Sequence, residues 1–252
     1  MKRIAIFALL PLLSVSSVWA QTPKENLEKA VEIYNANEAY QGQLNPKAIT
    51  DDEVGVVKSR MDQGLVLLEK VLREGNADQI KVARYFKTNS LYTYFYTLGM
   101  KGRNAEAYEL NKQIEADITR YTSTDFPMSY DFFEKKFTIK WENFAHTQAE
   151  YYTGFAEICY NMGKYPDAIR FARLAMNHSD VSPYLKYISV NKILDAYAKD
   201  NKLITETERL DFLLQSMQLY DVQEEANKQI IKDNNYPTTK RGAAALSQAL
   251  QT

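Results

Sequence analysis

The sequence predicts an all-α fold built from helical hairpins, and three observations support this. Apolar residues recur at intervals of three and four along most of the chain, which is the spacing of one helix face. Glycine and proline are sparse, at 9 and 7 of 252 residues, which disfavours a turn-rich β fold. Helix-start and helix-stop signals also alternate along the chain, so the helical segments are separated by short breaks.

The first twenty residues have the pattern of a secretory signal peptide. Lys2 and Arg3 form a basic start, residues 4–13 form an apolar run, and small side chains precede the expected cleavage site. The apolar run is shorter than the roughly 20 residues that a membrane-spanning helix needs. We therefore expect residues 1–20 to be cleaved, so that the mature chain starts at Gln21 and is exported. A Gram-negative periplasm fits this pattern best.

Three capping boxes mark helix starts in the mature chain. Thr22, Thr50 and Thr205 are each followed three residues later by a glutamate, which satisfies two free amide groups of the first turn reciprocally. Helices are predicted from 23 onward and over about 51–75, 78–100, 104–121, 146–162, 166–177, 183–200, 205–219 and 221–233. Residues 21–233 then form one helical domain. Residues 234–252 form a weakly ordered tail, in which 243–250 could be a short helix.

The stretch 121–144 differs from the rest, because it holds eight aromatic side chains in 24 residues whereas the whole chain is 12% aromatic. Phe137 and Trp141 belong to a short alternating pattern that indicates an extended segment around 135–141. The same two residues also lie on one helical face with Phe133, which favours a helix leading into the next element. Both interpretations are open at this stage.

Between residues 149 and 180, large and small side chains follow a pattern that suits two closely packed helices. A small residue allows two helices to approach, and bulky neighbours fill the remaining grooves. The pattern consists of Tyr152, Phe155, Ala156, Cys159, Gly163, Tyr165, Ala168, Ala172 and Ala175. It resembles a tetratricopeptide repeat, with two departures: Cys159 stands where the family prefers tyrosine, and Asp180 where it prefers proline. Weaker copies extend the resemblance over 88–220.

This resemblance implies an irregular right-handed α-α superhelix of tetratricopeptide-like hairpins, with an unrelated helical bundle as the alternative. The family presents the first helix of each repeat to a concave groove that binds a partner. Carried over residue by residue, the groove would be lined by Asn89, Tyr92, Tyr96, Glu150, Thr153, Glu157, Tyr160, Asn161, Asn191, Asp195 and Lys199. The alternative is that these polar residues form the ordinary solvated faces of surface helices.

The groove residues also bear on what kind of ligand is bound. Some family members clamp the terminal carboxylate of a peptide with paired lysine, arginine and asparagine side chains. Here Lys199 is the one basic residue among the carried-over positions, so this clamp is not expected. Tyrosines with a few acids suit a mixed apolar and polar ligand, or a basic one, because tyrosine offers a large contact area at low entropic cost.

Composition and motif searches give no sign of a cofactor, a metal or nucleic acid as a ligand. The chain has 31 basic and 32 acidic residues, so it lacks the basic excess that binds phosphate backbones. His146 and His178 fall on different predicted helices, and no histidine or cysteine lies at metal-ligand spacing from another. Cys159, the single cysteine, sits on a packing face, so we interpret it as a buried inert thiol.

We therefore expect an exported, non-catalytic scaffold that binds a protein or peptide partner in the cell envelope. Phe132 and Trp141 are further candidate contacts if the aromatic stretch forms an exposed patch, whereas they pack inside if it belongs to the core. The alternatives are a receptor for a small ligand or glycan, and a carbohydrate-active enzyme on a helical scaffold. Asp131 and Glu134 are the paired carboxylates that such an enzyme would use.

Overall fold

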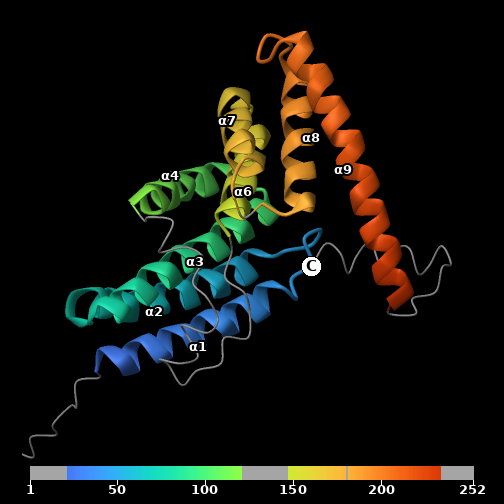
Figure 1. The fold of residues 1–252 in the computed structure, drawn as a ribbon. Coiled ribbons are helices and arrows are strands. Elements are labelled where there is room, and N and C mark those ends of the chain that lie inside the picture. The colour runs from blue at the N-terminus through green and yellow to red at the C-terminus, as the bar shows by residue number, and fades with distance from the viewer. Residues whose placement is uncertain (1–21, 121–146, 180, 234–252) are drawn as a thin grey trace, which may run out of the picture.

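The regular structure of the described residues is entirely helical, as Figure 1 shows. The computed structural model describes residues 22–120, 147–179 and 181–233. The helices are α1 (Pro23–Gln41), α2 (Asp51–Glu74), α3 (Ala77–Lys101), α4 (Asn104–Arg120), α6 (Gln148–Asn161), α7 (Tyr165–Met176), α8 (Pro183–Lys199) and α9 (Glu206–Asp233). The predicted all-α fold is thus confirmed. In these ranges no helix combines the length and the apolarity that crossing a membrane requires.

The helices stack as antiparallel hairpins, and the stack is curved. Each of the pairs α1–α2, α3–α4, α6–α7 and α8–α9 packs as a hairpin, and α2 and α7 also pack on the hairpins that follow them. The first helices α1 and α3, and likewise α6 and α8, pack against one another. Within the residues that the structure describes, contacts between the second helices are sparser, and α7 meets α9 through the Arg173–Glu208 ion pair. The stack is therefore tighter on the side of the first helices, which is the geometry of an α-α superhelix.

The hairpin α6–α7 carries the residue pattern from which the superhelix was predicted. Ala156 of α6 and Ala168 of α7 are buried, so small side chains lie where the two helices meet. The ring of Phe155 lies edge-on to Phe95 of α3 at 5.4 Å and to Phe171 of α7 at 5.3 Å, measured between ring centroids. Edge-on aromatic pairs at this distance are favourable beyond their buried area. Phe155 therefore links this hairpin to the preceding one.

The helix starts follow the capping chemistry expected from the sequence. Thr22, Thr50 and Thr205 each accept a hydrogen bond from the backbone amide three residues later, and the glutamate there accepts one in return. Two further capping boxes begin α3 at Asn76 and α6 at Thr147, which the sequence analysis did not identify. Five of the described helices thus begin with both partners of the box in place, which fixes where these helices start.

Two glycines end helices in the left-handed conformation that other residues rarely adopt. Gly102 has φ 79° after α3, and Gly163 has φ 71° after α6. Gly163 is the glycine of the repeat pattern, and Gly102 holds the corresponding place between α3 and α4. The predicted separation of 205–219 from 221–233 is wrong, since α9 runs through both as one helix. The reason is that no glycine or proline lies near residue 220 to interrupt it.

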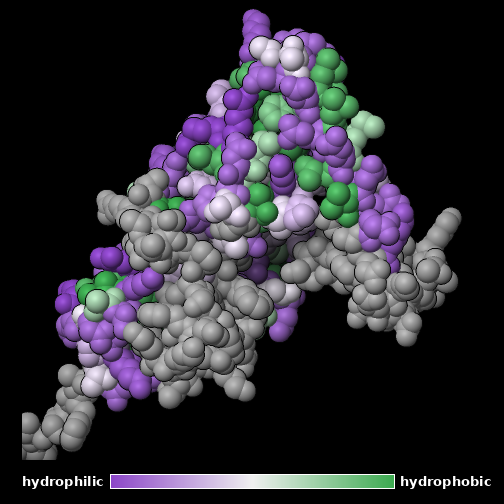
Figure 2. Space-filling view, viewed as in Figure 1, coloured by the Kyte–Doolittle hydropathy of each residue, from purple (hydrophilic) through white to green (hydrophobic). Residues whose placement is uncertain are grey.

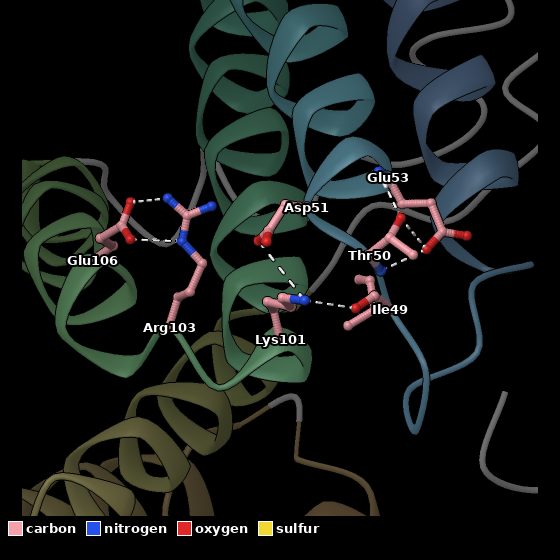
Figure 3. Close-up of polar contacts among 7 residues, drawn as sticks. All are labelled: Ile49, Thr50, Asp51, Glu53, Lys101, Arg103 and Glu106. Carbon is pink, nitrogen blue, oxygen red and sulfur yellow. Dashed lines mark hydrogen bonds and ion pairs between the residues drawn. The ribbon is translucent and has the colours of Figure 1, made fainter.

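A cluster of polar contacts fixes the junction between the first two hairpins, shown in Figure 3. At the end of α3, the Lys101 ammonium donates to the Ile49 carbonyl at 2.9 Å and lies 3.7 Å from the Asp51 carboxylate. At the start of α4, the Arg103 guanidinium donates twice to Glu106, at 2.6 Å each. The end of α3 is thereby tied to the start of α2 and leads directly into α4.

Several predictions concern residues outside the described ranges. These are the signal peptide over 1–20, the aromatic stretch 121–144 with its candidate extended segment at 135–141, and the tail over 234–252. They stay predictions.

Candidate partner-binding surface

Two exposed tyrosines, one on α3 and one on α8, lie near a carboxylate on α6. Each of these three helices is the first helix of its hairpin. Tyr96 of α3 and Tyr184 of α8 are 48% and 43% exposed, which is high for such large side chains. The pKa of the Tyr96 hydroxyl is raised, first by partial burial and then by the nearby Tyr184 and Glu157. The three groups are therefore close enough to interact electrostatically. We define the tyrosine surface as Tyr96, Glu157, Tyr184, Lys192 and Asp195.

Lys192 of α8 holds the acidic part of the tyrosine surface in place. Its ammonium lies 2.5 Å from the Glu157 carboxylate of α6 and 3.9 Å from the Asp195 carboxylate. It also sits 4.4 Å from the centre of the Tyr160 ring, a cation-π contact. The side chain of Lys192 is only 12% exposed, whereas that of Glu157 is 49% exposed. The cation is thus set below the surface, and the carboxylates and tyrosine rings face outward.

Two of the predicted groove residues lie inside the protein. Asn89 and Tyr92 of α3 are buried, and their polar groups join α3 to α6. The Tyr151 hydroxyl donates to the Asn89 side-chain oxygen at 2.8 Å, and the Tyr92 hydroxyl donates to the Glu150 carbonyl at 2.9 Å. Burial raises the pKa of both tyrosine hydroxyls well above the usual value. These residues position the helices that carry the tyrosine surface and are not part of it.

Three further predicted residues also make contacts at helix starts or between helices. The Glu150 carboxylate accepts from the Thr147 amide at 2.7 Å in the capping box of α6. The Thr153 hydroxyl oxygen lies 3.5 Å from that of Ser189, between α6 and α8. The Asn191 side-chain oxygen accepts a hydrogen bond from Ser216 at 3.0 Å, which joins α8 to α9. These side chains therefore serve the packing of the stack.

The remaining predicted residues divide into exposed ones and ones outside the described ranges. Asn161, Asp195 and Lys199 are exposed, and Tyr160 is half-buried beneath Lys192. Phe132 and Trp141 fall within the stretch that the structure does not describe. Tyr184 and Lys192, by contrast, were missed. The signal for them was the polar and aromatic face of 183–200, but the repeat alignment selected Asn191 in place of its neighbour Lys192 and did not extend back to Tyr184.

Cys159 is buried in the helical stack, and His178 is partly buried just after the end of α7. Burial raises the pKa of the Cys159 thiol to about 12, so its reactive thiolate is scarce at neutral pH. Within 22–120, 147–179 and 181–233 no three histidine, cysteine or acidic side chains gather as metal ligands would. His178 instead has its ring nitrogen Nε2 2.8 Å from the Gln148 amide oxygen.

A depression of about 600 Å³ lies beside α7. It is lined by Pro166, Ile169, Arg170, Arg173, Leu174, Asn177 and His178. Two of these side chains are already engaged: Arg170 pairs with Glu115 at 2.7 Å and Arg173 with Glu208 at 2.8 Å. Their charges therefore serve contacts between α7 and the neighbouring helices α4 and α9.

Comparison of the chain with protein-family models, curated proteins and solved structures found no match. The resemblance to tetratricopeptide repeats therefore rests on the residue pattern and on the hairpin packing.

Proposed function

We propose that the protein is an exported tetratricopeptide-like scaffold that binds a peptide segment of a partner protein on the tyrosine surface. The observation that carries this proposal is the ion pair that joins Lys192 of α8 to Glu157 of α6, near which the half-exposed Tyr96 of α3 and Tyr184 of α8 lie. Half-exposed tyrosines supply both apolar area and a hydroxyl, which is why they are enriched at binding sites. The stacked hairpins supply a rigid support, so these side chains need little ordering when the partner binds.

The charges of the tyrosine surface favour a segment with apolar and basic side chains. Glu157 and Asp195 are exposed acids, and Lys192, the base between them, is nearly covered. Lys199 lies one turn beyond Asp195 and is exposed, so its ammonium would donate to a carboxylate at the margin of the tyrosine surface. A lysine or arginine of the partner would face Glu157 and Asp195, while apolar side chains would pack on the tyrosine rings.

The place of action that we propose is the cell envelope, most simply a Gram-negative periplasm. Support comes from the basic start and the short apolar run of residues 1–20. Cys159 is buried and has no second cysteine to pair with in the sequence, so an oxidising compartment would not alter the fold through a disulfide.

Site-specific photo-crosslinking tests this function. A photoreactive phenylalanine analogue is placed at position 96 or 184 of the chain, and an envelope fraction is irradiated with it. Leu174, an exposed residue of α7, is the matched control position. We expect one partner protein to be crosslinked from 96 and from 184 but not from 174. Tyr96→Ala should weaken binding of that partner by about tenfold, a loss of about 1.4 kcal/mol.

Two results would contradict the proposed function. One is crosslinking of the same protein with equal yield from position 174, which would place the contact elsewhere. The other is partner binding that is unchanged by both Tyr96→Ala and Tyr184→Ala.

A further inference from the structure

The mature chain that we propose begins with a glutamine, directly before the first helix. Cleavage after Ala20 leaves Gln21 as the first residue, followed by Thr22 and Pro23. An N-terminal glutamine carries a nucleophile and an electrophile on the same residue, the α-amine and the side-chain carboxamide. Attack of the amine on the carboxamide carbon closes an unstrained five-membered ring, so the first residue of this chain is a candidate modification site.

The start of α1 is held by Thr22 and Glu25. The Thr22 hydroxyl accepts from the Glu25 amide at 3.2 Å, and the Thr22 amide and hydroxyl both donate to the Glu25 carboxylate, at 2.7 and 2.9 Å. Both residues are exposed, and Figure 2 shows hydrophilic side chains at this end of α1 on the face in view. The capping box uses these two residues only, so a reaction of the residue before it leaves all three hydrogen bonds in place.

A positive charge is unfavourable at this end of α1. The free amide groups of the first helical turn make the start of a helix electropositive. An α-ammonium on residue 21 would stand one residue before the N-cap Thr22, and the carboxylate of Glu25 is already engaged by Thr22. Cyclisation converts the ammonium into a neutral lactam amide, which removes this charge from the start of the helix.

We propose that Gln21 cyclises to pyroglutamate once export has freed its α-amine, so this modification rests on the proposed export. The α-amine nitrogen attacks Cδ of the Gln21 side chain, a C–N bond forms, and the bond from Cδ to the side-chain nitrogen breaks. That nitrogen leaves as ammonia and takes the proton that the attacking amine loses. The step needs no oxidant, reductant or second substrate. Its product is a chain without a free α-amine, which aminopeptidases require.

Mass spectrometry of the exported protein tests this modification. The full chain, residues 1–252, is expressed in a Gram-negative host, and the protein is purified from the periplasm in the cold at neutral pH. We expect the intact mass of residues 21–252 to be lower than that of the unmodified sequence by about 17 Da, the mass of ammonia. The N-terminus should also be closed to Edman degradation.

Gln21→Asn is the matched control. It keeps a carboxamide but is one methylene shorter, so the same attack would close a strained four-membered ring. This variant should be exported equally, keep its full mass and give a readable Edman sequence.

The possible contrary results separate the modification from the export. An unmodified glutamine at the start of the exported protein, or a loss of ammonia that arises only during storage, would overturn the cyclisation and leave the export standing. A chain that keeps residues 1–20, or that starts at another residue, would overturn both proposals.

Discussion

At the residue scale, a glycine determines how closely α6 approaches α3. A Cβ atom at Gly154 would lie 2.5 Å from the Tyr92 hydroxyl oxygen and 3.1 Å from Cε1 of Phe95. The Tyr92 side chain cannot simply turn away, because it is buried and donates to the Glu150 carbonyl. The missing side chain of Gly154 therefore permits the contact that joins the second hairpin to the third.

Gly154→Ala should accordingly destabilise the protein by about 1–2 kcal/mol. Alanine gains about 1 kcal/mol in helix propensity, but overpacking a buried contact costs about 1–3 kcal/mol, and the rigid tyrosine ring makes the larger cost apply here. Gly55→Ala is the matched control, because nothing lies within 4 Å of its Cβ position on α2. It should stabilise by about 0.5–1 kcal/mol. Urea unfolding followed by circular dichroism measures both, and a stabilised Gly154→Ala would refute the close approach.

The sequence located some site residues well and others poorly, for a reason visible at single positions. Tyr96 was predicted at the groove and is half-exposed there. Asn89 was predicted at the same groove, yet it is buried against Tyr151, a residue 62 positions away in the chain. A periodic pattern predicts which residues share a helix face, but only the packing of distant helices decides how much of that face is covered.

At the element scale, helix starts carry a titratable contribution to stability. The pKa values of Glu25, Glu53 and Glu208 are lowered from the ordinary 4.5, first by the hydrogen bond from the backbone amide of the capping threonine. Each carboxylate therefore binds a proton less readily in the folded state than in the unfolded state. Their contribution to the free energy of unfolding is fully present above pH 4.5, the ordinary pKa. It is lost as the pH falls through the lowered pKa values of the folded state.

The melting temperature should thus fall as the pH is lowered from 5 to 3, with the sharpest change in the region of glutamate titration. The triple variant Glu25→Gln, Glu53→Gln, Glu208→Gln should melt lower at pH 7 and lose less on acidification, because glutamine does not titrate. Thermal unfolding followed by circular dichroism at several pH values provides the measurement. If the melting temperature of the variant falls as much on acidification as that of the parent, groups other than these three glutamates cause the fall.

Most helices could be predicted from the sequence because their starts and stops are local. A threonine followed by a glutamate three residues later, or a glycine that can adopt positive φ, acts within one turn of the chain. The start of α6 at Thr147 uses the same chemistry but lies directly after the aromatic stretch, where helix and strand patterns overlap. The unbroken length of α9 was missed because residue 220 was taken as a boundary without a breaker residue.

At the scale of the whole molecule, the order of the hairpins could be predicted and a superhelix was expected from the repeat resemblance, but the particular curvature could not be predicted. Alternating helices and short turns dictate that neighbours run antiparallel. The curvature instead depends on α1 packing against α3 and α6 against α8, whereas α7 meets α4 and α9 through the ion pairs of Arg170 and Arg173. It brings Tyr96, Glu157 and Tyr184 together from three helices, and no local pattern encodes their spacing.

Hydroxyl-radical footprinting of the tyrosines tests the central claim most directly: the first helices bury one set of tyrosines and offer another to a partner. In the free protein, Tyr96 and Tyr184 should be modified readily, whereas Tyr92 and Tyr151 should be protected. Adding the partner found by crosslinking should protect Tyr96 and Tyr184 together. Ready modification of Tyr92 and Tyr151 in the free protein, or unchanged labelling of Tyr96 and Tyr184 in the complex, would contradict the account.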